Sequence, residues 1–187
     1  MTGTGTGPPK RDTYRHGDLR RALVEAGTDL ARGGGPDAVV LREATRRAGV
    51  APSAAYRHFA DRRALLGAVC SAAQAALAVA MEGELAKVPN RGDPATRARA
   101  RLRAVGTGYL RFAWAEPGLF RAAFSASEDL RDAASPARAG EGGLTPFQIL
   151  AAALDGLVEA GVLPRERRPG AEFLAWSAAH GLAMLLI

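Results

Sequence analysis

The chain has 187 residues, enough to bury a sizeable core in one large domain or in two smaller ones. Hydrophobic residues make up 48% of it, many of them alanine, which is typical of a globular, mainly helical protein, and the single cysteine excludes an intramolecular disulfide. The net charge of +6 lies mostly in residues 1–66, which hold 12 Lys and Arg against 7 Asp and Glu. This asymmetry indicates an anionic partner for that part of the chain, either nucleic acid or an anionic membrane surface.

Two features argue against a membrane protein. The longest apolar stretch, residues 173–187, is interrupted by Ser177 and His180 and is shorter than the roughly 20 residues that a membrane span needs. No signal-peptide pattern stands at the start of the chain. We therefore expect a cytoplasmic protein, in which Cys70 is a small buried hydrophobe within an apolar helical run.

Residues 1–13 alternate Gly with Thr, contain two prolines and have almost nothing to bury. They predict a disordered basic arm. Its Lys10 and Arg11, with Arg15 just beyond, either lie along DNA phosphates or in a minor groove, or are merely solvated.

Helical periodicity covers most of the remaining chain, without strand alternation or a repeat. Gly49 is placed to supply a positive φ between two helices, and Asp61 and Asp93 are placed to cap the helices that follow them. Residues 119–124 form a short apolar piece, and residues 125–143 are small, acidic and Gly-rich, which predicts a mobile loop. The predicted helices cover residues 18–33, 41–48, 52–59, 61–87, 94–116, 145–160 and 170–187.

The last predicted helix stops inside an apolar run with no cap or polar tail. We expect it to pack against a second copy of the chain, unless the chain continues past Ile187. The fold class predicted is all-α, with a boundary near residue 65.

Residues 41–65 carry the most chemistry, because arginines, a tyrosine and a histidine gather on the second of two short helices. At about 100° per residue, Ala55, Phe59 and Pro52 share the side that packs. Small residues on the other side, Ser53 and Ala54, allow close approach to base edges. Arg57 lies beside them and is suited to binding a guanine with both ends of its guanidinium group.

Other polar residues of this stretch are placed to grip phosphates. Tyr56 and His58 lie on opposite flanks of the second helix, where each can reach a different DNA strand. Arg42 and Arg46 share the outer face of the preceding helix. Periodicity alone leaves a second interpretation open, in which this is an ordinary amphipathic helical hairpin with solvated arginines.

The stretch LREATRRAGVAPSAAYRHFADRRALL, residues 41–66, resembles the DNA-binding segment of tetracycline-repressor-type (TetR family) bacterial regulators, and residues 14–23 resemble the lead-in and first helix of that family. The resemblance implies that residues 52–59 are the recognition helix and that Tyr56, His58 and Arg62 contact phosphates. It also implies a homodimer on a near-palindromic operator, most often a repressor that is released by a small molecule bound in the C-terminal helices.

The C-terminal half resembles one subgroup of this family. Trp176, His180 and Gly181 match a Trp-x-x-x-His-Gly element, and residues 117–121 look like its inner segment. Trp176 and His180 share one helical face, which suits either a packed, hydrogen-bonded histidine or a pocket residue.

The match to the DNA-binding segment has departures. Ala44-Thr45 stands where the family usually has Ile-Ala, and Ala55 replaces a larger aliphatic residue. Ala51 replaces the serine that usually caps the recognition helix and touches a phosphate. We expect the fold to survive these changes and the affinity for DNA to be lower.

The sequence therefore predicts a two-domain, homodimeric transcription regulator with a disordered arm at 1–13, a helix-turn-helix domain at 14–66 and a helical ligand-binding and dimerisation domain at 67–187. Two rivals remain: a ligand-independent, architectural DNA-binding protein, and a helical enzyme or carrier whose basic helices bind an anionic cofactor. We expect no catalytic residues, no cofactor and no metal. The expected DNA contacts are Arg42, Arg46, Ser53, Ala54, Tyr56, Arg57, His58 and Arg62. The expected ligand-pocket residues are Phe112, Trp114, Phe120, Phe124, Phe147, Leu150, Trp176, His180 and Met184.

Overall fold

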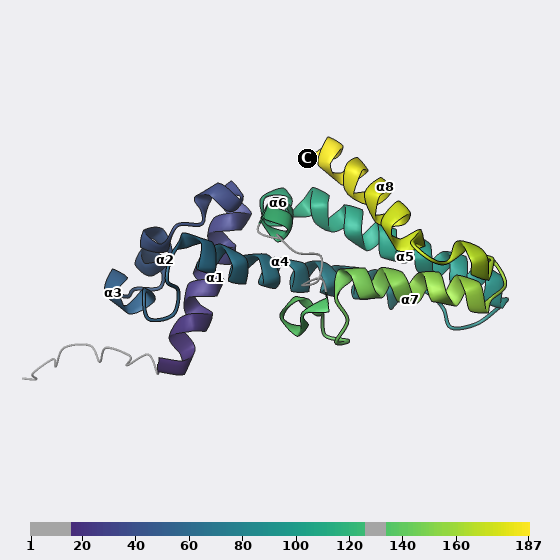
Figure 1. The fold of residues 1–187 in the computed structure, drawn as a ribbon, viewed down its shortest axis with the longest axis horizontal. Helices are drawn as coiled ribbons and strands as arrows, with labels where there is room; N and C mark the ends of the chain where they lie inside the picture. Colours follow the sequence, from purple (N-terminus) through teal and green to yellow (C-terminus); the bar gives the residue numbers. More distant parts are fainter. Residues whose placement is uncertain (1–15, 126–133) are drawn as a thin grey trace, which may run out of the picture.

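The computed structural model describes residues 16–125 and 134–187, and within these ranges the fold is all-helical, as expected (Figure 1). Short 3-10 turns join several of the helices. The predicted arm at 1–13 lies outside the described residues. The α-helices are α1 (His16–Gly34), α2 (Leu41–Arg47), α3 (Pro52–Ala55), α4 (Arg62–Leu85), α5 (Pro94–Ala115), α6 (Pro117–Ser125), α7 (Pro146–Glu159) and α8 (Ala171–Leu186).

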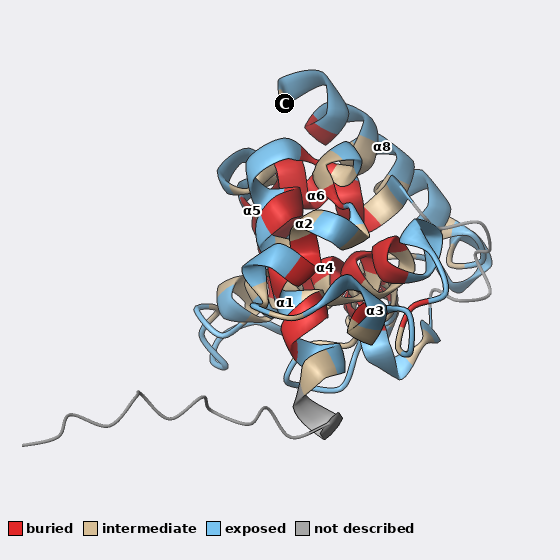
Figure 2. Cartoon of the chain, turned by 90° about the vertical axis from the view of Figure 1, so that its left-hand side faces the viewer, coloured by how far each residue is buried: buried red, intermediate tan, exposed pale blue. Residues whose placement is uncertain are grey.

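Helix α4 is the axis of the fold, because α1, α5, α6 and α7 all pack against it. Its start is fixed as the sequence predicts: the Asp61 carboxylate accepts a hydrogen bond from the amide of Ala64 at 2.8 Å. By length and composition α4 would pass for a membrane span, but α1, α5, α6 and α7 pack against it and bury many of its apolar side chains. The view along the molecule shows these positions as a buried centre (Figure 2). The buried side chains of α4 include Leu65, Leu66, Val69, Cys70, Ala73, Leu77 and Met81.

The three helices at one end form a small module around the start of α4 (Figure 1). Gly49 has a φ of +67° in the turn between α2 and α3, the left-handed conformation that its position predicts. Arg20 of α1 lies over the ring of Phe59, 5.0 Å from its centroid, and ties α1 to the end of this module.

Helix α3 is shorter than the predicted span of 52–59. It ends at Ala55, and residues 56–58 continue as a tight turn in which the amides of His58 and Phe59 both bond to the Ala55 carbonyl at 2.9 Å. This turn lets Phe59 reach the core, where it is 2% exposed. No side chain caps the start of α3 at Ala51, so a longer helix has little local support.

The residues after Glu116 also differ from expectation. Residues 119–124, predicted as a short apolar piece, belong to the full helix α6. Its Gly118 packs directly on the last turn of α1, where a Cβ would lie 2.7 Å from the carbonyl oxygen of Arg32. Only glycine allows the two backbones to approach this closely.

Part of the predicted mobile loop at 125–143 is held in place. Its residues 126–133 lie outside the described part of the chain. Beyond them, the Glu82 carboxylate of α4 accepts hydrogen bonds from the amides of Glu141 and Gly142, both at 3.0 Å. The loop is therefore anchored on α4, because the partly exposed Glu82 side chain of the central helix supplies an acceptor that the local sequence does not reveal.

The last two helices complete the domain. A capping box opens α7, with Thr145 and Gln148 exchanging hydrogen bonds with each other's amides. Helix α8 packs on α5 and α7 with one side only, and most of its surface faces outward (Figure 2).

Candidate functional site

The turn that follows α3 displays the polar residues picked out in the sequence. Tyr56 is 61% exposed, Arg57 and Ser53 are exposed, and Ala54 and His58 are partly exposed. Beneath them Ala55 and Phe59 are buried, as the periodicity predicts, whereas Pro52, predicted to face inward, is exposed. Because α3 ends at Ala55, Tyr56, Arg57 and His58 stand on the turn after the helix and not on the helix itself.

Helix α2 offers less free positive charge than its sequence suggests. Arg42 and Arg46 are both exposed, but the Arg46 guanidinium donates to the Glu43 carboxylate at 2.6 and 2.8 Å. Arg47 donates to the same carboxylate at 3.4 Å. The hydrogen bonds from Arg46 lower the pKa of Glu43 to about 2, so Glu43 stays ionised at neutral pH and partly neutralises this surface.

Arg62 is exposed, but its guanidinium is bonded to backbone of the same chain. Its guanidinium donates to the carbonyl oxygens of Val39 at 2.8 Å and Pro36 at 2.7 Å, in the segment that leads into α2. It also lies 3.6 Å from the Asp37 carboxylate. In this arrangement Arg62 positions α2 relative to α4, a structural role beyond the phosphate contact that the resemblance implies.

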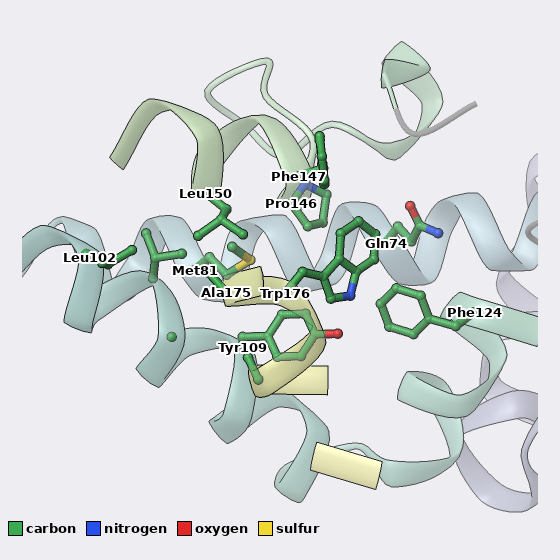
Figure 3. A pocket seen from close by; sticks show the side chains of 13 residues that line it. Gln74, Met81, Leu102, Tyr109, Phe124, Pro146, Phe147, Leu150, Ala175 and Trp176 are labelled. Atoms are coloured by element: carbon green, nitrogen blue, oxygen red, sulfur yellow. The ribbon is translucent and has the colours of Figure 1, made fainter. Parts of the chain in front are cut away.

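The C-terminal helices surround a second candidate site, a partly open cavity of about 210 Å³ (Figure 3). It lies among α4, α5, α6, α7 and α8. No lining residue is charged, and aromatic side chains gather at one end of it. The lining residues are Gln74, Met81, Leu102, Val105, Gly106, Tyr109, Phe124, Pro146, Phe147, Leu150, Ala175, Trp176 and Ala179.

Four of the expected pocket residues line this cavity: Phe124, Phe147, Leu150 and Trp176. The others lie elsewhere. Phe112 and Phe120 are buried core residues, and Met184 is exposed on α8. Trp114 is 70% exposed on the surface and does not line this cavity. The buried positions Val105, Tyr109, Phe112 and Ala113 define the inward side of α5, and Trp114 falls off it.

His180 stands behind the cavity wall in a hydrogen-bonded cluster. Its Nδ1 lies 2.8 Å from the hydroxyl of Tyr109, and its ring packs against Phe124 with centroids 4.7 Å apart. Burial lowers the pKa of His180 and raises that of Tyr109, while a hydrogen bond with Trp176 acts to lower the latter. The lowered pKa favours a neutral His180 ring, and the tautomer of that ring decides which group donates the hydrogen bond between His180 and Tyr109.

The sequence missed nine of the thirteen lining residues, including Tyr109 and all of the small ones. Gly106, Ala175 and Ala179 line the cavity because they are small, and no apolar pattern marks a position where volume is absent. Gln74 carried a usable signal: it is the one amide in the apolar run of α4, and it is buried. Its Nε2 donates to the carbonyl oxygen of Ala123 at 2.7 Å, which joins α4 to α6 beside the cavity.

Family models match both halves of the chain. The model for bacterial regulatory proteins of the tetR family covers residues 23–69, which contain α3 and the exposed turn that follows it. A model for the tetracyclin repressor-like C-terminal domain covers residues 102–187, which supply most of the cavity wall. The chain belongs to the TetR family. It is therefore a DNA-binding transcription regulator and not an enzyme, and residues 23–69 hold its DNA-binding domain.

A solved structure supports the fold of this TetR-family chain. A protein with unknown function from Rhodococcus sp. RHA1 is 28% identical to it, with a TM-score of 0.71 over 94% of this chain and 86% of that one. No curated protein matches the chain significantly. The Trp-x-x-x-His-Gly subgroup remains a prediction.

Proposed function

We propose that this TetR-family regulator is a cytoplasmic, homodimeric repressor that a small molecule releases from its operator. The observation that carries the proposal is the pairing of two sites by one helix. The exposed surface of α3 lies beside the start of α4, and the apolar cavity borders the later turns of the same helix (Figure 1).

Helix α8 supports a dimer. Leu174, Leu182 and Leu185 recur at helical spacing on its outer face, and two of them are 77% and 85% exposed. The small residues Ala178 and Gly181 lie exposed between them, which lets a second helix approach closely. An apolar face of this size on a folded protein is typical of an interface between subunits. We propose that a second copy of the chain, related by a twofold axis, packs on this face of α8.

In such a dimer the two α3 surfaces would meet successive major grooves about one DNA turn apart. The contacts proposed are Ser53, Ala54 and Arg57 to base edges and Tyr56 and His58 to phosphates. Arg42 and Arg46 would approach the backbone, with Arg46 first having to share or leave Glu43. Arg62 would add charge while its inner hydrogen bonds position α2.

A ligand in the cavity would act through the spacing of the two reading surfaces. We propose that the ligand binds more tightly when α4 is displaced from its DNA-bound position. The ligand then lowers the affinity for the operator, at most by the ratio of its own affinities for the displaced and DNA-bound conformations. The cavity favours this sensor over the ligand-independent rival, which requires a fully packed interior.

The proposal is tested by selecting DNA from a random pool with the full chain and measuring the affinity of the selected sequence. Arg57→Ala should weaken specific binding by about 1–3 kcal/mol and relax the preference at one base position. Tyr56→Phe should weaken binding to all sequences alike, because it removes a phosphate contact. Arg165→Ala, an exposed arginine far from α3, is the charge-matched control and should have little effect.

Oligomeric state is measured on the same samples by light scattering. Leu174→Glu with Leu185→Glu should give a folded monomer that binds the operator weakly. Selection of no consensus sequence, or a wild-type monomer bound to a single half-site, would contradict the proposal.

A further inference from the structure

The wall of the cavity excludes a charged ligand. Its lining residues include no Asp, Glu, Lys, Arg or His. The polar groups at its aromatic end are already bonded within the protein: Gln74 Nε2 to the Ala123 carbonyl, and the Tyr109 hydroxyl to His180. An ion placed here would lose its hydration without gaining a partner of opposite charge.

The aromatic end is shaped by rings that stand at angles to one another. Trp176 lies between Phe124 and Phe147, with centroid separations of 6.0 and 5.2 Å and interplanar angles of 62° and 51° (Figure 3). Tyr109 lies below Trp176 in this view. Tilted rings present both faces and edges to the cavity. A flat aromatic ligand can pack against these rings in the offset or edge-to-face geometry that aromatic pairs prefer.

The size of the cavity limits the guest further. Its volume of about 210 Å³ exceeds the roughly 150 Å³ of an apolar cavity that holds benzene. Along α4 the wall extends from Gln74 to Met81, and along α5 from Leu102 to Tyr109. Each span is about two helical turns, or roughly 10 Å. The space is long enough for a second fused ring.

We propose that the cavity binds an uncharged, planar aromatic molecule of about two fused rings. The assignment rests on the sensor part of the proposed function, and it narrows that function to one chemical class. A weakly polar substituent is accommodated at the end of the wall that holds the polar side chains of Gln74 and Tyr109 and the indole of Trp176.

Three probes of matched size test the class: 2-naphthol, 2-naphthoate and 1-decanol, titrated into the full chain by calorimetry near neutral pH. We expect 2-naphthol to bind at least about tenfold more tightly than either of the others. Tight binding of naphthoate would overturn the exclusion of charge. Tight binding of decanol would overturn the requirement for a flat guest.

Two variants place the probe in this cavity. Gly106→Leu adds a side chain to the wall at a position where a Cβ meets nothing within 4 Å, and it should abolish naphthol binding. Gly83→Leu makes the same change at an exposed, equally open position of α4 and should leave binding intact. Ala175→Phe fills the cavity from α8 and gives a second filled variant if Gly106→Leu does not fold.

Unchanged naphthol affinity in a folded filled variant, or no binding by the wild type, would overturn the assignment. Operator binding without ligand is measured on the same samples. Its retention in a protein that binds no probe would refute the ligand class alone, whereas its loss in a protein that binds naphthol would refute the proposed regulator alone.

Discussion

Arg32, in the last turn of α1, donates a hydrogen bond from Nε to the Glu116 carboxylate at 2.9 Å. Glu116 is the single residue between α5 and α6, so this ion pair joins the DNA-binding module to the cavity domain. A second nitrogen of Arg32 donates to Asp29 at 2.6 Å. Directly beside this pair, Gly118 packs on the backbone of α1.

The ion pair itself should contribute little stability. Both side chains are substantially exposed, so water and salt screen their attraction. A double-mutant cycle with Arg32→Ala and Glu116→Ala, followed by urea unfolding, should give a coupling energy below about 1 kcal/mol that shrinks as salt is added. A coupling of several kcal/mol would mean that the pair is desolvated in solution.

The packing of Gly118 should matter more than the ion pair. In Gly118→Ala the new methyl group would meet the carbonyl oxygens of Ala31 and Arg32, which are backbone atoms that move only with the helix. We expect a loss of about 1–3 kcal/mol in unfolding free energy. Gly83→Ala is the matched control: its helical site is open, and alanine there should stabilise by about 0.5–1 kcal/mol. Equal effects of the two substitutions would contradict the close approach.

The sequence predicted features that depend on local chemistry. Asp61 caps α4 and Gly49 adopts positive φ because each needs only its neighbours in the chain. Ala55 and Phe59 are buried as the helical period requires, although the helix around them is shorter than expected. The domain limits at 14–66 and 67–187 stay a prediction.

Features that depend on distant contacts could not be predicted. The anchoring of residues 141–142 requires Glu82, about sixty positions earlier, and the burial of Gly118 requires α1. Periodicity also separates inward from outward positions without distinguishing a filled core from a void. The sequence therefore yielded four of the cavity's aromatic and aliphatic residues but not the small residues that leave the space empty.

Acid should weaken the fold through His180. Burial holds its pKa below the ordinary value of about 6.5, so the unfolded chain takes up the proton more readily than the folded one. The stability contributed by the neutral ring is fully present above about pH 6.5 and is lost as the pH falls through the folded-state pKa. His180→Gln keeps an acceptor near Tyr109 but does not titrate, so its unfolding midpoint should change less than that of the wild type between about pH 7 and pH 5. NMR titration of His180 supplies the direct measurement, and a pKa at or above about 6.5 would refute the argument.

Glu43 should restrain DNA binding. Its carboxylate holds Arg46 and Arg47 on α2, and with a pKa of about 2 it stays charged at every pH at which the protein would bind DNA. Removing this charge in Glu43→Gln frees the guanidinium of Arg46 and makes the surface more positive. We expect affinity for any DNA at low salt to rise about threefold to tenfold, with a steeper dependence on salt concentration.

Two comparisons separate this effect from a change in overall charge. Asp155→Asn removes an exposed carboxylate that pairs with Arg168 on the far side of the molecule, and it should leave DNA affinity almost unchanged. Arg46→Gln should cost more affinity in the Glu43→Gln background than in the wild type, because only the released guanidinium reaches a phosphate without first breaking an ion pair. If Arg46→Gln costs the same affinity in both backgrounds, Arg46 binds phosphate while still paired with Glu43, and the restraint does not exist.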